Sequence, residues 1–308
     1  MAYGGIDVVG PCAFGVTPTI LDQVEGSLLN LQPRSFTKST DGQVDPTYSA
    51  YESFAPMFRG TTDKIAAFLT LAGISASIPA APGFVQYFQA VDLTTGLRKS
   101  GANHASATFA TCLVVPRTLT VNHGEQGAKI SFDVIGYNAS GLTNPVVLAS
   151  GATLPALAGV SQLYTMGPIK IGGTLYEGMQ SYSIDFGLKI AIKMGTGVSY
   201  PQLVYIEDRR PKITIKTNDA SLLSALTLLG TPISGGATKL FLRSFSQSGL
   251  RTADGSAAHI SFTMTLGNAY VTEKAATHPG EFQTGIVLEP IWDQSNAILN
   301  INTATIIS

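Results

Sequence analysis

The sequence predicts a mainly β protein made of two tandem β-sandwich domains, each flanked by one short α-helix. Three observations predict this class. Apolar residues alternate with polar ones in several segments, the chain repeats itself at an offset of about 155 residues, and each copy contains one short helical pattern. A chain of 308 residues is long enough for two such domains, each with its own core.

The internal repeat divides the chain. Residues 24–73 and 179–230 share a pattern in the same order, and Arg34 matches Lys189 while Lys38 matches Lys193. Further on, ISF occurs at 130–132 and again at 260–262. This last match has a smaller offset, which predicts an insertion of about 25 residues in the first copy. The expected parts are a first domain at 1–145, a linker at 146–164, a second domain at 165–275 and a C-terminal arm at 276–308.

The strand predictions rest on alternation. Residues 182–193, YSIDFGLKIAIK, predict one long half-buried strand, and residues 259–267, HISFTMTLG, predict another. KISFDVIGY, at 129–137, shows the same pattern more weakly. Strands of this kind have one face on the core and one in water, as in antiparallel sheets.

Each copy also predicts a helix of about three turns. Asp63 and Asp219 are the expected N-caps, and Gly73 and Gly230 are the expected stops. Connections rich in turn residues follow the long strands at 39–46 and 194–201.

Two uncharged stretches resemble membrane spans in length only. Prolines, glycines and hydroxyl residues interrupt 65–85, and 134–169 is typical of loop and linker, so no transmembrane helix is predicted. The N-terminus shows no secretory signal, which favours synthesis in a cytoplasm. The uncharged, β-prone C-terminal arm is expected to dock on its own sheet or on a neighbouring subunit.

The composition favours self-association. Charged residues make up 13% of the chain and the formal net charge is -1, against roughly 25% charged residues in typical soluble domains. Two interpretations remain open: an ordinary β protein of low charge, or a protein whose surface is largely covered by copies of itself.

Residue patterns for chemistry are missing. Cys12 and Cys112 have no zinc-like or C-x-x-C spacing and are expected to be small buried residues. The four histidines are scattered and are expected to be exposed, at loops or strand ends. The S-x-x-K match at 35–38 lacks its partner motifs. The sequence therefore predicts no enzyme, no metal site and no cofactor.

Four basic residues form a matched set. Arg34 and Lys38 in the first copy, and Lys189 and Lys193 in the second, are spaced four apart on predicted strands and so share a strand face. They are either a solvated face or a basic stripe at a subunit interface or facing a polyanion. A nearly neutral chain disfavours tight nucleic-acid binding.

The order of these features resembles the major tail tube proteins of long-tailed bacteriophages. It comprises a long strand pair with a glycine-rich tip, a P-x-I-T-I-like strand at 211–215, a D-x-x-x-L-x-x-L helix, and a G-x-x-x-x-I-S-F strand. The resemblance covers most of residues 20–140 and 165–275. It implies sheets that join into a β-barrel ring, and stacked rings that form a hollow tube for the passage of DNA.

Most members of this family carry one such domain and form rings of six. Two copies per chain then predict homotrimeric, pseudo-hexameric rings in a virion tail, assembled in the host cytoplasm, in contact with other tail proteins and with no membrane. The alternatives are a viral capsid or decoration protein, and a β-sandwich binding module. A carbohydrate-binding module would need clustered aromatics, whereas the chain has the single Trp292.

Overall fold

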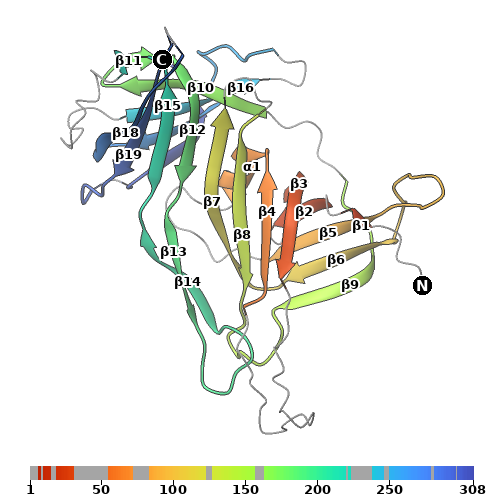
Figure 1. Ribbon diagram of the computed structural model, residues 1–308. Coiled ribbons are helices and arrows are strands. Elements are labelled where there is room, and N and C mark those ends of the chain that lie inside the picture. The colour runs from red at the N-terminus through yellow and green to blue at the C-terminus, as the bar shows by residue number, and fades with distance from the viewer. Residues whose placement is uncertain are drawn as a thin grey trace.

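The computed structural model describes residues 6–7, 10–14, 19–30, 55–71, 83–122, 127–156, 163–219, 221–222, 238–245, 250–278, 281–295 and 297–308. The protein is mainly β and its sheets are antiparallel, as the alternation predicts (Figure 1).

A central sheet of eight strands runs through both halves of the chain. Its order is β18-β19-β15-β12-β7-β8-β4-β3, so the first four strands come from the second half and the last four from the first half. The bounds are β18 Gly267–His278, β19 Glu281–Pro290, β15 Lys212–Thr217, β12 Met179–Asp185, β7 Cys112–Asn122, β8 Lys129–Gly136, β4 Met57–Thr62 and β3 Thr19–Asn30.

A side sheet belongs to each half. The first continues from β3 in the order β2-β5-β6-β9, with β1 beside β5, and the second has the order β11-β10-β16-β17-β20. The first contains β1 Ile6–Asp7, β2 Gly10–Phe14, β5 Phe84–Ala90, β6 His104–Phe109 and β9 Val146–Ala152. The second contains β10 Leu163–Ile171, β11 Thr174–Tyr176, β16 Thr238–Phe245, β17 His259–Met264 and β20 Asn300–Thr305.

The long strand predicted at 182–193 is broken. β12 ends at Asp185, and a separate hairpin of β13 (Leu188–Lys193) and β14 (Leu203–Arg209) follows it downward in Figure 1. The break falls at Gly187, whose φ of 57° favours glycine. Its carbonyl accepts the N–H of Arg210 at 2.9 Å. A side chain at Gly187 would collide with the Arg210 carbonyl, so the chain can turn here only with glycine.

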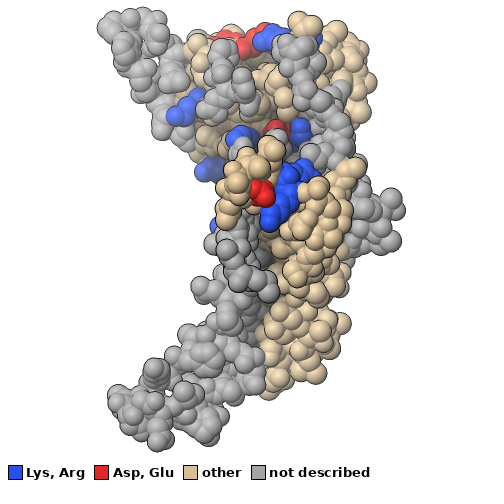
Figure 2. All heavy atoms as spheres, turned by 90° about the vertical axis from the view of Figure 1, so that its right-hand side faces the viewer, with Lys and Arg blue, Asp and Glu red and all other residues tan. Residues whose placement is uncertain are grey.

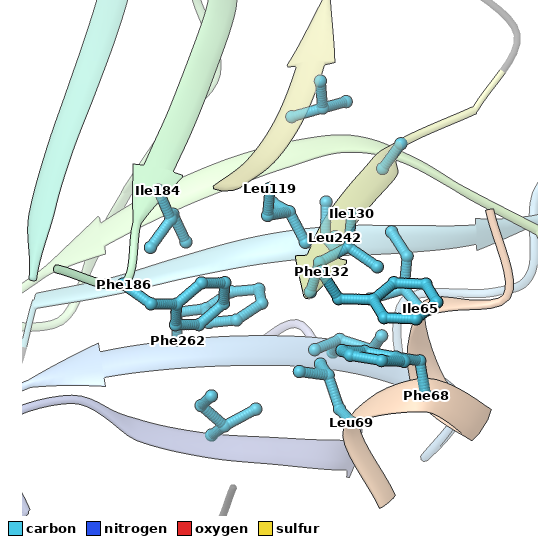
Figure 3. Packing of buried hydrophobic residues seen from close by; sticks show 14 of the residues in the cluster. Ile65, Phe68, Leu69, Leu119, Ile130, Phe132, Ile184, Phe186, Leu242 and Phe262 are labelled. Atoms are coloured by element: carbon cyan, nitrogen blue, oxygen red, sulfur yellow. The ribbon is translucent and has the colours of Figure 1, made fainter. Parts of the chain in front are cut away.

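The core is one cluster that joins both halves. Figure 3 shows Phe68, Leu69 and Phe132 from the first half packed with Phe186 and Phe262 from the second. The two halves therefore share a buried interior, where the sequence predicted a core for each domain.

The strands of the central sheet do not all have one wet face. On β8, Ile130 and Phe132 point into the main core, but Ile135 on the other face is also buried. It belongs to a second cluster with Leu113, Val115 and Val204, against which Leu188, Ile190 and Ile206 pack. The β13–β14 hairpin thus covers this part of β7 and β8.

Three further predictions differ from the structure. The expected linker, 146–164, begins with β9, which pairs with β6. The stretch 134–169, expected to be loop and linker, also contains the end of β8 and most of β10. The two ISF segments lie in β8 of the central sheet and β17 of the second side sheet, so this match is wrong.

The C-terminal arm docks within the chain, as β19 beside β15 and β20 beside β17.

The helix predicted after Asp63 is α1, Ile65–Leu71. Its first turn is held by Thr62, whose Oγ1 accepts the N–H of Lys64 at 3.1 Å, while Asp63 Oδ1 is buried without a hydrogen-bond partner. Asp219 does act as predicted, since its Oδ1 accepts the N–H of Ser221 at 2.9 Å. Most of the helix predicted after Asp219 falls on residues outside those that the structure describes. Among the described helices, none has the length and apolar character to cross a membrane.

Candidate functional site

The central sheet has one apolar and one polar face across its middle strands. Tyr182, Ile184, Ile213 and Ile215 point into the core, and the residues between them point away from it. We call the other side the polar face. It is formed by Thr118, Thr120, Asn122, Lys129, Ser131, Ser181, Ser183, Asp185, Lys212, Thr214 and Lys216. Hydroxyl and amide side chains outnumber charged ones on it.

The two halves meet in a strand ladder. β12 of the second half pairs antiparallel with β7 of the first half, from Ser181 opposite Asn122 to Asp185 opposite Thr118. Beside the ladder, the hydroxyl of buried Tyr182 donates to the carbonyl of Phe241 at 2.8 Å and so ties the central sheet to the second side sheet. The polar face therefore continues without interruption from one half to the other.

The two described members of the predicted basic set, Lys189 and Lys193, lie on β13 of the hairpin. Lys189 Nζ is 2.8 Å from Glu207 Oε2, and this hydrogen bond raises the pKa of Lys189. Lys193 Nζ lies 5.5 Å from the centre of the Tyr205 ring. Arg34 and Lys38 fall outside the described residues. The structure thus gives Lys189 and Lys193 local partners on β14.

A buried carboxylate near the base of the hairpin escaped sequence reasoning. Asp133 of β8 is 0% exposed, and its two oxygens accept from Arg59 Nε and Arg117 Nε, each at 2.7 Å. The hydrogen bond from Arg59 to Asp133 is the main reason that the pKa of Arg59 is raised. Arg117 Nη1 also donates to the carbonyl of Leu188 at 3.1 Å, which fixes the start of β13.

A second charged cluster has a buried cation with more exposed carboxylate partners. Arg243 of β16 is buried, and it donates to Asp254 through Nε and Nη2 at 3.1 Å and to Glu177 at 3.1 Å. Burial works to lower the pKa of Arg243, but the hydrogen bonds to the two carboxylates outweigh it and the pKa is raised. A shallow cavity of roughly 130 Å³ adjoins Arg243, lined also by Met166 and Arg251.

Two histidines are buried, so the prediction that they are exposed is wrong for both. The Nδ1 of His104 accepts the N–H of Ala90, and the Nδ1 of His259 accepts the N–H of Ser244, each at 3.0 Å. Burial, together with the charge of Arg98, lowers the pKa of His104. His123 and the side chain of His278 lie outside the described residues.

Cys112 is buried, as predicted, and burial raises the pKa of its thiol to about 12. Within the described part of the chain, no group of three or more His, Cys, Asp or Glu residues is arranged to hold a metal ion. What stands out is the extended polar face of the central sheet. No known family matches the sequence, and neither does any curated protein.

Proposed function

We propose that this chain is a structural virion protein whose copies join into rings that stack as the hollow tail tube of a long-tailed bacteriophage. The observation that carries the proposal is the β7–β12 ladder, which makes one central sheet from two halves. A sheet that grows by adding equivalent units and closes on itself removes its exposed edges. The low charge of the chain suits a surface covered by copies.

The proposed duplication is supported by the positions of the strands. Met57 and Lys212 begin β4 and β15, His104 and His259 begin β6 and β17, and Cys112 and Gly267 begin β7 and β18, each pair 155 residues apart. The sheet orders match as well: β3-β4-β8-β7 corresponds to β12-β15-β19-β18, and β2-β5-β6-β9 corresponds to β10-β16-β17-β20. If these strands are equivalent, the first copy needs no large insertion, and the second copy extends through β20.

Two local hydrogen bonds recur with acceptor side chains that lie 155 residues apart. The Oγ1 of Thr62 accepts the N–H two residues on, and Thr217 Oγ1 does the same at 3.0 Å. His104 and His259 each bind, through Nδ1, a backbone N–H of the neighbouring strand. Such side-chain details are hard to explain by a shared strand order alone, and they support descent of both halves from one domain.

The polar face is the proposed lining of the tube. DNA must slide past it without being held, so a surface dominated by Ser and Thr is suitable, whereas a dense row of cations would bind phosphates. Three lysines, Lys129, Lys212 and Lys216, lie among the eleven residues of this face together with Asp185. The role is passive, and it requires no catalytic group or cofactor.

Three chains would complete a ring of six equivalent units. Rings would stack in the virion tail after assembly in the host cytoplasm, in contact with other tail proteins.

Electron microscopy of the purified protein at increasing concentration tests this function. We expect rings or stacked tubes with a central hole and three chains per ring. Six chains per ring in projection would refute the trimer, and particles that stay monomeric at every concentration would refute self-assembly.

A further inference from the structure

We infer that the interface between neighbouring chains is an antiparallel ladder between β18 of one copy and the C-terminal part of β3 of the next, an inference that rests on the proposed function. The partner is a second copy of this chain. The interface would repeat, between chains, the β7–β12 ladder that already joins the two halves within one chain.

Both strands have a suitable open side. Within the described part of the chain, β18 pairs with β19 alone. β3 pairs with β2 only through Thr19–Val24, so Gly26–Asn30 have β4 on one side and no described strand on the other. Open edges of this length bind another strand readily.

The internal ladder supplies the register. In it, Ser183 lies opposite Thr120. The residue 155 positions before Ser183 is Leu28, and the residue 155 positions after Thr120 is Ala275. The same shift places Gly26–Asn30 opposite Glu273–Thr277.

An exposed leucine gives an independent reason to expect a neighbour on this side. Leu148 of β9 pairs with Ala107, and Ile301 of β20 pairs with Phe262, which is 155 residues after Ala107. Both partners are fully buried, so Leu148 and Ile301 occupy equivalent places on the core side of their sheets. Ile301 is 8% exposed and Leu148 is 62% exposed.

The difference between them has a structural cause. β20 lies against α1 of the first half, whose Ile65, Phe68 and Leu69 share a cluster with Ile301. In a single chain nothing described plays that part for β9. Figure 2 views the side of the molecule that carries the first side sheet, and the lower part of its described surface has no charged side chains. The second half of the preceding chain would cover Leu148 as the first half covers Ile301.

Cross-linking tests the register. Leu28→Cys and Ala275→Cys are combined in a Cys12→Ser background, while Cys112 stays because its buried thiol is unreactive. A short thiol cross-linker should give dimers and trimers on a denaturing gel and nothing larger. The control pair, Leu28→Cys with Asn268→Cys, lies about 20 Å out of register and should not cross-link.

Substitutions on β9 test the covered patch. Leu148→Asp should lower ring assembly at least tenfold, as measured by sedimentation, and leave the circular dichroism of the monomer unchanged. Val147→Asp is the matched control, because Val147 is 58% exposed on the same strand and points to the opposite side.

The possible outcomes distinguish a wrong interface from a wrong function. Rings without the Leu28–Ala275 cross-link, or rings that tolerate Leu148→Asp, would overturn the interface and leave the proposed function standing. A wild-type protein that forms no rings, together with a double-cysteine variant that gives no cross-links, would overturn both.

Discussion

The two halves of the chain share their strand order but bury charge in opposite ways. The first half buries an anion: Asp133 is inaccessible, and its partners Arg59 and Arg117 have side chains 56% and 36% exposed. The second half buries a cation: Arg243 is 8% exposed, and its partners Glu177 and Asp254 are largely in water. The arrangement around Asp133 does not recur in the second half, where Thr214 pairs with Val287 as Arg59 pairs with Asp133 in the first.

The two clusters should differ in how much stability is lost when their arginines are removed. A buried ion left without partners costs far more than an exposed ion left without one, because water can solvate only the latter. The first cluster also fixes the hairpin through the bond from Arg117 to Leu188, whereas the second joins β16 to flanking loops. The shared strand order therefore does not depend on these charges, which serve local positioning.

The largest effect is expected from removing both arginines around Asp133. The double variant Arg59→Met with Arg117→Met should lower the free energy of unfolding by about 3 kcal/mol, because the carboxylate stays buried without a counter-charge. Urea unfolding followed by circular dichroism measures the change. Adding Asp133→Leu should restore much of the loss, since an apolar side chain of similar size needs no partner. A triple variant as unstable as the double would show that the carboxylate is not the cause.

A smaller effect is expected in the second half. Arg243→Met should cost about 1–2 kcal/mol, because it removes hydrogen bonds but leaves carboxylates that water can reach. Arg251→Met is the matched control, since Arg251 lines the same cavity with an exposed side chain and should change stability little. A loss equal to that of the double arginine variant would show that exposed carboxylates and a buried carboxylate are equally sensitive to loss of their arginine partners in this protein.

Sequence reasoning predicted the mainly β class of the fold correctly, but it misplaced details that depend on strand pairing. Alternation correctly marked Tyr182 and Ile184 as core residues. It could not show the break at Gly187, because a glycine in an alternating segment looks like any small outward residue. The ISF match misled because an apolar, hydroxyl and aromatic triplet suits many β-strands.

The charged clusters were hidden for a related reason. Arg59 lies 74 residues from Asp133 in the chain and becomes its neighbour only when β4 pairs with β8. The one available signal was an aspartate inside the otherwise apolar run FDVIG. The two buried histidines were likewise taken as surface residues, although their shared offset of 155 was readable in the sequence.

His104 and His259 accept the same kind of backbone hydrogen bond in the two halves. The pH dependence of stability tests the contribution of His104. The folded-state pKa of His104 is below its ordinary value of 6.5, so the unfolded chain takes up the proton first as the pH falls. The stability from neutral His104 is complete above about pH 6.5 and is lost as the pH falls toward the folded-state pKa. His104→Asn keeps an acceptor for the Ala90 N–H but does not titrate.

The difference in unfolding free energy between wild type and His104→Asn should therefore shrink from about pH 7.5 to about pH 5.5. Urea unfolding at both values measures it. A constant difference would mean that His104 has the same pKa in the folded and the unfolded chain.

The smallest effect is expected at the basic residues of the hairpin. The side chains of Lys189 and Glu207 are 68% and 48% exposed, and exposed ion pairs of this kind contribute little to stability. Lys189→Ala should leave the urea midpoint unchanged, and Lys193→Ala should do the same. The hairpin is instead held by Val204, Ile190 and Ile206 on the apolar patch of β7 and β8. Val204→Ala should therefore destabilise the protein where the lysine variants do not, and the opposite ranking would show that charge fixes the hairpin.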